Sequence, residues 1–124
     1  MTEKSLAGLR ILIIEDESLI SMLIEDTVAE IGCEVVGIAA RLDDAMRKLS
    51  SLSFDVVILD VNLHGCETYP IAETLAARSV PFIFATGYGA AGLPEAFREI
   101  AVLQKPFRRI DLQRALVAAL TSSA

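Results

Sequence analysis

Short apolar runs alternate with longer segments of helical periodicity along the chain, and this alternation restricts the fold more than any other feature. We expect strands at residues 9–14, 34–39, 56–60, 82–85 and 101–103. We expect helices at residues 18–31, 41–49, 68–78, 94–100 and 108–120. Strands that are each followed by a helix predict an α/β protein with a doubly wound parallel sheet and helices on both faces. Among five-stranded sheets of this flavodoxin-like (βα)5 kind, the strand order 2-1-3-4-5 is a common solution.

The expected helices differ in how strongly their periodicity supports them. Residues 18–31 carry apolar side chains at helical spacing, and we expect one buried face made of Leu19, Ile20, Leu23, Ile24, Thr27, Val28 and Ile31. Gly32 follows where a helix stop is expected. After the fourth strand, glycines at positions 87, 89 and 92 disfavour a regular helix by about 1 kcal/mol each. The fourth helix is therefore expected to be short, late or mobile.

Length and composition favour one domain over residues 1–124, without a separate output domain. Hydrophobic residues make up 53% of the chain, enough for a packed core. The net charge of −6 argues against binding nucleic acid or anionic lipid through a broad basic face. Because no apolar run is long enough for a signal peptide or a membrane span, we expect a cytoplasmic protein. Cys33 and Cys66 are expected to be reduced, at opposite rims of the sheet.

Five polar residues follow or end the expected strands, and the topology brings them to one rim of the sheet. Glu15 and Asp16 follow the first strand, and Asp60 ends the third. Thr86 and Lys105 follow the fourth and fifth strands. The first and third strands are neighbours in the predicted order, at the switch point where such sheets bind ligands. Polar loop residues are common, but their convergence on one rim indicates a site.

Three carboxylates, a hydroxyl and a lysine suit phosphoryl chemistry. Oxygen ligands without His or Cys favour Mg²⁺, which keeps several waters and leaves positions for phosphate oxygens. A carboxylate beside the metal can attack phosphorus and form an aspartyl phosphate. The cation and the lysine would spread the charge of the transferring group, while the hydroxyl donates to one of its oxygens.

At this point the chain resembles a known family, the receiver domains of bacterial two-component response regulators. The matching stretches are IIEDE at 13–17, VVILDVNL at 56–63, FATG at 84–87 and LQKPF at 103–107. They occur in the family's order and spacing, and the resemblance covers essentially the whole chain. Members of the family have the 2-1-3-4-5 strand order, so the resemblance supports the predicted fold.

The resemblance implies a role for each residue of the acidic cluster. Asp60 corresponds to the phosphoacceptor and is also a metal ligand. Asp16 corresponds to the direct metal ligand, and Glu15 acts mainly through bound water. Asn62 corresponds to the residue whose backbone carbonyl completes the metal site, so its side chain is not required there.

The resemblance also assigns the remaining two residues of the rim. Thr86 corresponds to the hydroxyl that swings toward the phosphoryl group. Lys105 corresponds to the family's ion-pairing lysine, which is followed by a cis peptide bond at Lys105–Pro106. His64, four residues past Asp60, is expected to be either an exposed spacer or a contact to the phosphoryl group or a partner.

The function implied is that of a stand-alone receiver in a two-component system or phosphorelay. It would accept a phosphoryl group on Asp60, with Mg²⁺ bound, from a sensor histidine kinase or a histidine phosphotransfer protein. It would then signal to a protein partner or serve as a phosphate sink, as a monomer or a phosphorylation-dependent dimer. We expect no separate enzymatic activity, although such domains assist their own phosphorylation and dephosphorylation.

Three departures from the commonest family pattern point to one subgroup. Val102 stands three residues before the lysine, where many members carry an aromatic residue that turns inward on activation. The stretch after the fourth strand is rich in glycine, and the loop after Asp60 reads NLHGCETYP, without an early proline. These features and the FATG stretch resemble a receiver subgroup typical of alphaproteobacteria.

Two other functions stay open on the residues alone. One is a phosphohydrolase with an aspartyl nucleophile, but such enzymes usually carry a second Asp two residues after the first, where this chain has Asn62. The other is a receiver fold that binds proteins without being phosphorylated. The presence of Asp16, Asp60, Thr86 and Lys105 argues against that alternative.

Overall fold

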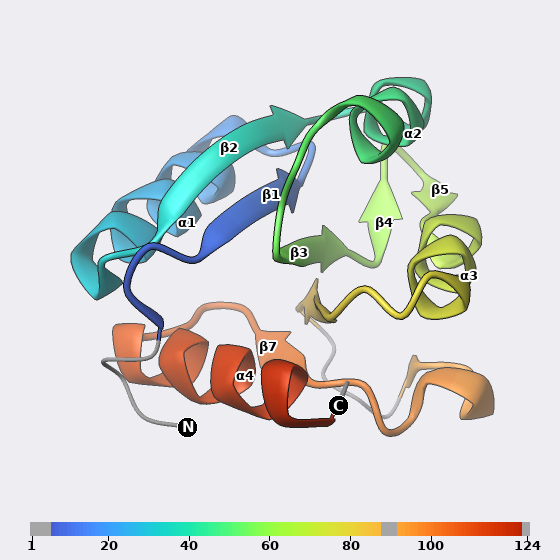
Figure 1. Ribbon diagram of the computed structural model, residues 1–124. Coiled ribbons are helices and arrows are strands. Elements are labelled where there is room, and N and C mark those ends of the chain that lie inside the picture. The colour runs from blue at the N-terminus through green and yellow to red at the C-terminus, as the bar shows by residue number, and fades with distance from the viewer. Residues whose placement is uncertain (1–5, 88–91, 123–124) are drawn as a thin grey trace.

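A five-stranded parallel sheet forms the centre of the molecule, in a computed structural model that describes residues 6–87 and 92–122 (Figure 1). The sheet order is β2-β1-β3-β6-β7. Because β4 and β5 lie outside this sheet, the order equals 2-1-3-4-5 among the sheet strands, which confirms the predicted fold. The strands are β1 Arg10–Ile14, β2 Glu34–Ala39, β3 Val56–Asp60, β6 Phe82–Thr86 and β7 Val102–Gln104.

Two helices cover each face of the sheet. The helices α1 (Ser18–Ile31) and α4 (Arg109–Ser122) pack on one face. The helices α2 (Leu42–Ser51) and α3 (Tyr69–Ala77) pack on the other. Successive β1 side chains point to opposite faces, so that Ile11 and Ile13 enter the first core cluster while Leu12 and Ile14 enter the second. Burial on both faces explains why the central strands read as uninterrupted apolar runs.

The first helix ends where the sequence predicted, but it buries a narrower face than expected. Gly32 adopts a left-handed φ of 95° and caps α1 with its own N–H bonded to the Ala29 carbonyl. Leu19 is 79% exposed and Leu23 is 43% exposed, so the prediction that they belong to the buried face was wrong. The side chains that do face the sheet follow a tighter stripe of Ile20, Ile24, Thr27, Val28 and Ile31.

Met22 joins Leu19 and Leu23 on the outside of α1, where it is 56% exposed. These three side chains are called the α1 apolar patch below. Their spacing of three and four residues places them side by side on one helix surface. Large exposed apolar groups in a cluster mark a surface that contacts another protein more often than do scattered ones.

Two segments differ from the predicted secondary structure. The helix expected at residues 94–100 is only a single turn of 3-10 helix, η3 (Glu95–Phe97), in line with the expectation that the fourth helix is short. Residues 88–91, part of the segment expected to be mobile, lie outside the described residues. A short hairpin of β4 (Asn62–Leu63) and β5 (Cys66–Glu67) replaces the loop expected after Asp60.

The two cysteines agree with the expectation that they are not bonded to each other. Cys33 is buried and Cys66 is exposed, and both thiols are free. None of the helices in residues 6–87 and 92–122 is long and apolar enough to cross a membrane. Phe107 packs against the core beside the turn that contains the cis Lys105–Pro106 peptide, the cis bond that the resemblance implied.

Candidate functional site

The carboxyl ends of β1 and β3 lie side by side and bring three carboxylates together. Glu15 and Asp16 directly follow β1, and Asp60 is the last residue of β3. One carboxylate oxygen from each of these residues lies within 4.8 Å of the others. Glu15 is 2% exposed and Asp60 is 7% exposed, so two of the three acidic groups are withdrawn from solvent.

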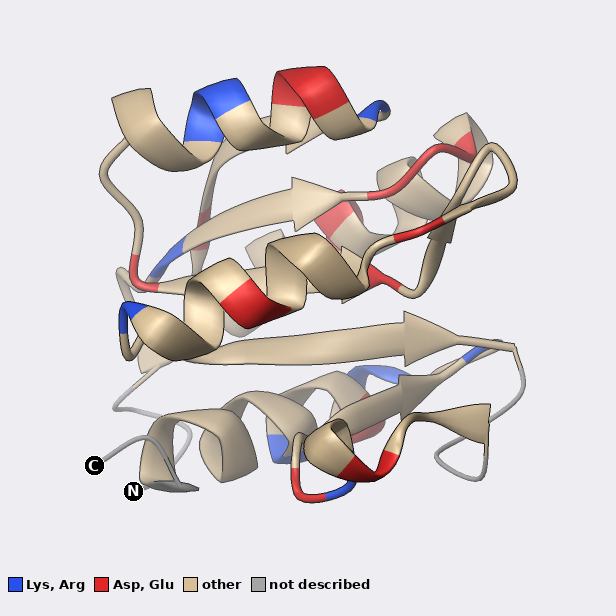
Figure 2. Cartoon of the chain, turned by 90° about the vertical axis from the view of Figure 1, so that its right-hand side faces the viewer, with Lys and Arg blue, Asp and Glu red and all other residues tan. Residues whose placement is uncertain are grey.

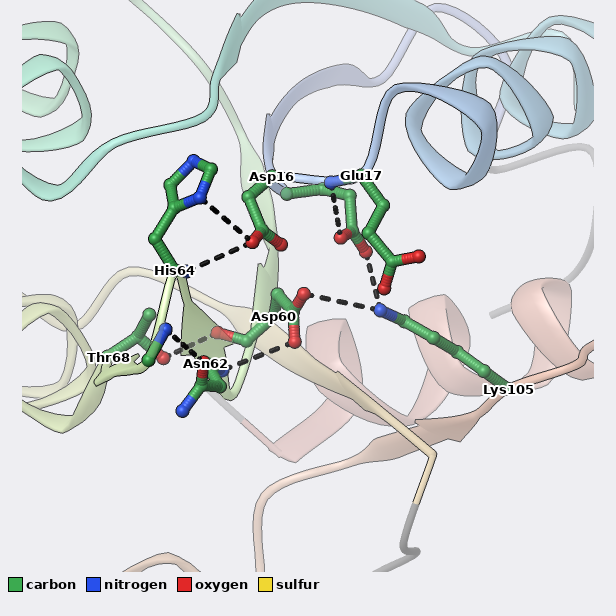
Figure 3. A network of polar contacts seen from close by, with 9 residues as sticks. Asp16, Glu17, Asp60, Asn62, His64, Thr68 and Lys105 are labelled. Carbon is green, nitrogen blue, oxygen red and sulfur yellow. Dashed lines mark hydrogen bonds and ion pairs between the residues drawn. The ribbon is translucent and has the colours of Figure 1, made fainter.

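Lys105 supplies the positive charge that this cluster needs. It follows β7, whose pairing with β6 continues in a hydrogen bond from the Lys105 N–H to the Thr86 carbonyl. The Lys105 Nζ atom lies 2.6 Å from Glu15 Oε1 and 3.3 Å from Asp60 Oδ2 (Figure 3). One ammonium group therefore bridges two acids, and the third, Asp16, is left to other partners.

Burial and neighbouring charge shift the proton affinities of these groups. Burial raises the pKa of Glu15 to about 7, a hydrogen bond with Asp60 adds to the rise, and the contact with Lys105 opposes it. Burial lowers the pKa of Lys105, but the hydrogen bond from its ammonium to Glu15 and the charge of Asp60 outweigh that effect, so its pKa is raised overall. Burial also tends to raise the pKa of Asp16, but the backbone N–H of His64 contributes to holding it below its usual value.

Hydrogen bonds from the following loop hold Asp60 in place at both its side chain and its backbone. The Asn62 N–H donates to Asp60 Oδ1 at 3.2 Å. The buried Thr68 hydroxyl, just before α3, donates to the Asp60 carbonyl oxygen at 2.5 Å. With one carboxylate oxygen facing Asn62 and the other facing Lys105, the Asp60 side chain has a defined orientation (Figure 3).

A pocket of about 810 Å³ opens over the cluster. Its wall includes Asp16, Asp60, Thr86 and Lys105, which the sequence predicted to share one rim. Glu15 does not line the pocket; it is buried and contacts Lys105, which does. Figure 2 shows several acidic segments in the loops at the carboxyl ends of the strands.

The donor set fits a small divalent cation. All three acidic groups offer hard oxygen atoms, and the single lysine leaves an excess of negative charge when every carboxylate is ionised. Mg²⁺ needs few protein ligands of this kind and retains several waters, for which the pocket has room. Asn62 is adjacent, but its side-chain Oδ1 accepts a hydrogen bond from the Gly65 N–H, so any ligand role falls to its backbone.

Sequence reasoning missed two contacts that support this site, one made by His64, which it had named without this role, and one made by Thr68. His64 donates its backbone N–H to Asp16 Oδ2, and Thr68 donates its hydroxyl to Asp60. The signal for His64 was the pair His64–Gly65 flanked by two short segments, which is a possible two-residue turn. Thr68 stands before a helix with Pro70 in its first turn, where a hydroxyl residue is a common cap; here the hydroxyl bonds to β3 instead.

Comparisons with known proteins agree with the fold. A family model described as the response regulator receiver domain matches residues 11–117. The transcriptional regulatory protein PdtaR of Mycobacterium tuberculosis is 32% identical over 116 residues, which cover 90% of this chain and 57% of PdtaR. The chain thus spans about half the length of the curated relatives it matches.

Two solved structures extend this similarity to three dimensions. SdrG from Sphingomonas melonis Fr1, known from a solution structure, is 40% identical to this chain and gives a TM-score of 0.83. The alignment covers 97% of this chain and 99% of SdrG. The receiver domain of sensor histidine kinase PA1611 from Pseudomonas aeruginosa PAO1, solved with a magnesium ion in its active site cleft, is 28% identical with a TM-score of 0.76. That alignment covers 93% of this chain and 99% of the other. Membership of the FATG subgroup stays a prediction.

Proposed function

The chain belongs to the response regulator receiver family, and on that basis we propose that it is a phosphoacceptor signalling protein that is modified on Asp60. An Asp60 carboxylate oxygen forms a bond to phosphorus while the N–P bond of a phosphohistidine breaks. The electron pair of that bond stays on the histidine nitrogen, which then takes up a proton. The donor is a sensor histidine kinase or a histidine phosphotransfer protein, and the receiver unit spans residues 1–124.

The observation that carries this proposal is the placement of Asp60 between an acidic pair and a lysine, at the base of a pocket. Its Oδ2 atom lies 3.3 Å from Lys105 Nζ, and its Oδ1 atom accepts a hydrogen bond from Asn62. A nucleophilic carboxylate must be held in one orientation for in-line attack, and these contacts do that. Because its ammonium group already contacts Asp60 Oδ2, Lys105 can form an ion pair with a phosphoryl group attached to Asp60.

We propose that Mg²⁺ is held by Asp16 and Asp60, by the backbone carbonyl of Asn62, and by Glu15 through water. When bound, the ion supplies positive charge for the oxygens of the transferring group. The magnesium ion in the PA1611 receiver structure supports this assignment. Thr86, on the pocket wall, donates its hydroxyl to a phosphoryl oxygen, and Lys105 pairs with another.

A protein donor must reach the pocket across the neighbouring surface, and the α1 apolar patch is suited to receive it. Glu17 lines the pocket and immediately precedes α1, so Leu19 and Met22 lie within the first two helical turns from the pocket edge. Their exposed side chains offer an apolar contact that a small phosphodonor does not need. After phosphorylation the protein signals through contacts with a downstream partner, or as a dimer, in the cytoplasm.

The two other candidate functions are less well supported. A phosphohydrolase needs a general acid near Asp60, but the side chain at the expected position, Asn62, is an amide that accepts a hydrogen bond from Gly65. A binding module that is never phosphorylated has no need for a half-buried Lys105 shared between Glu15 and Asp60. We therefore propose no catalytic activity on other substrates, only assistance with the protein's own phosphorylation and dephosphorylation.

Incubation with acetyl phosphate and Mg²⁺, followed by intact mass spectrometry, tests the proposal. We expect a gain of one phosphoryl group in the wild type and in Asp43→Ala, which removes an exposed carboxylate on α2. We expect no gain in Asp60→Ala or when EDTA replaces Mg²⁺. Phosphorylation of Asp60→Ala, or steady turnover of a phosphate ester without a modified protein, would refute the assignment.

A further inference from the structure

The β4–β5 hairpin is a tight, well-anchored element next to the site. Asn62 pairs with Glu67 and Leu63 pairs with Cys66, so only His64 and Gly65 form the turn. Both turn residues have positive φ, 49° at His64 and 84° at Gly65, as a type I′ hairpin turn requires. Leu63 is 2% exposed and packs into the core under α2 and α3, which fixes the hairpin to the sheet.

The tip of this hairpin contacts the metal-binding acid that Lys105 does not reach. The His64 N–H donates to Asp16 Oδ2 at 3.0 Å, across 48 residues of sequence. The His64 ring is 64% exposed, and its Nδ1 atom lies 3.6 Å from the same oxygen, which is too long for a hydrogen bond (Figure 3). The backbone N–H of the turn thus makes the hydrogen bond to Asp16, while the imidazole lies only within ion-pair distance of the same oxygen.

We propose that the β4–β5 hairpin positions Asp16 for Mg²⁺, with the His64 N–H as the positioning group. This inference rests on the metal site of the proposed function. With Oδ2 held by the turn, the carboxylate has a fixed direction and its other oxygen is available to the ion. Outer partners that orient metal ligands typically change metal affinity by about 10- to 100-fold when they are removed. The left-handed conformation of His64 and Gly65 is therefore part of the metal site.

The chain offers a matched pair of glycines for the test. Gly65 and Gly8 have similar left-handed φ values, 84° and 78°, and a Cβ added at either meets nothing within 4 Å. Alanine at either position imposes the same kind of backbone strain without a steric clash. Gly8 precedes β1 and bonds to Gly32, at the opposite rim of the sheet from the site. Gly8→Ala is thus the control for general destabilisation.

Mg²⁺ titrations of the full chain, followed by amide NMR shifts at constant ionic strength, provide a readout that is independent of phosphorylation. We expect Gly65→Ala to weaken Mg²⁺ binding on the order of tenfold and Gly8→Ala to leave it within twofold. Amide hydrogen exchange at His64 should become faster only in Gly65→Ala. Equal Mg²⁺ affinities in the two alanine variants would overturn the inference.

A second pair of variants separates the turn from the imidazole and replaces Gly65→Ala should it not fold. His64→Asn and His64→Val both remove the ring, but asparagine accepts a positive φ readily and valine does not. We expect His64→Asn to bind Mg²⁺ like the wild type and His64→Val to bind it more weakly. Equal weakening in both would mean that the ring orients Asp16, against the proposal. Absence of any Mg²⁺-dependent shift in the wild type would instead refute the metal site itself.

Discussion

Replacing Glu15 with glutamine should stabilise the metal-free protein at neutral and alkaline pH, although Glu15 forms an ion pair with Lys105. The pKa of the buried Glu15 rises from 4.5 to about 7. Between these values the folded chain binds a proton that the unfolded chain has lost, so stability falls as pH rises. The difference of about 2.5 pH units corresponds to about 3 kcal/mol, all of it lost by pH 8.

Lys105 and Asp16 change their protonation outside this window. The raised pKa of Lys105 stabilises the fold below its ordinary value near 10.5, and that contribution is lost only at higher pH. The lowered pKa of Asp16 contributes stability above its ordinary value of 3.8, which is lost only in acid. Removing one partner of an isolated buried ion pair destabilises the folded protein. In Glu15→Gln, however, the Lys105 ammonium still has the Asp60 carboxylate 3.3 Å away.

Urea unfolding monitored by far-UV circular dichroism, at pH 5 and pH 8 in EDTA, measures the effect. At pH 8 we expect the midpoint of Glu15→Gln to exceed that of the wild type by on the order of 1 to 2 M, given typical urea dependences. At pH 5 the two midpoints should nearly coincide. The exposed Glu30→Gln on α1 controls for the loss of one negative charge. If Glu15→Gln is less stable than the wild type at pH 8, the Lys105 ion pair outweighs the burial of Glu15, and the reasoning is wrong.

Three further outcomes are expected. Thr68→Val removes the hydroxyl that bonds to the Asp60 carbonyl and should cost about 1 to 2 kcal/mol in urea unfolding, whereas Thr68→Ser should cost less. Leu19→Lys changes an exposed position, so stability should stay within about 0.5 kcal/mol; phosphotransfer from a protein donor should slow, while acetyl phosphate labelling should not. Lys105→Ala leaves Glu15 facing Asp60 without a cation and should lose about 3 kcal/mol or more in EDTA, with part of the loss restored by Mg²⁺.

The strands and the rim of the site were predictable because they follow from simple repeating constraints. A central parallel strand is buried on both faces. In a chain where apolar runs alternate with helical segments, the four apolar residues from Ile11 to Ile14 therefore indicate such a strand. The carboxyl end of each strand lies at the same edge, so the positions of Asp60 and Lys105 follow from the strand boundaries. The roles of these residues came from the resemblance and are still proposals.

The buried face of α1, the β4–β5 hairpin and the orientations of the acidic side chains could not be predicted, because they depend on three-dimensional geometry that sequence periodicity does not specify. Helical spacing cannot give the width of the buried face, which is why Leu19 and Leu23 were misplaced. Two-residue strands have no periodicity, so the hairpin at 62–67 was invisible apart from its His-Gly turn. Adjacent acids look alike in a sequence, and only the sheet decides that Glu15 turns inward to Lys105 while Asp16 lines the pocket.

The bridge from Lys105 to Glu15 spans 90 residues and sets an order of completion during biosynthesis. The ribosome releases the acidic pair first, Asp60 next, and the compensating ammonium of Lys105 after both. A nascent chain that stops before residue 105 contains all three carboxylates but lacks their counter-charge. Without that counter-charge the three carboxylates favour a hydrated, open rim, so the capacity to be phosphorylated should emerge only after residue 105 has been released.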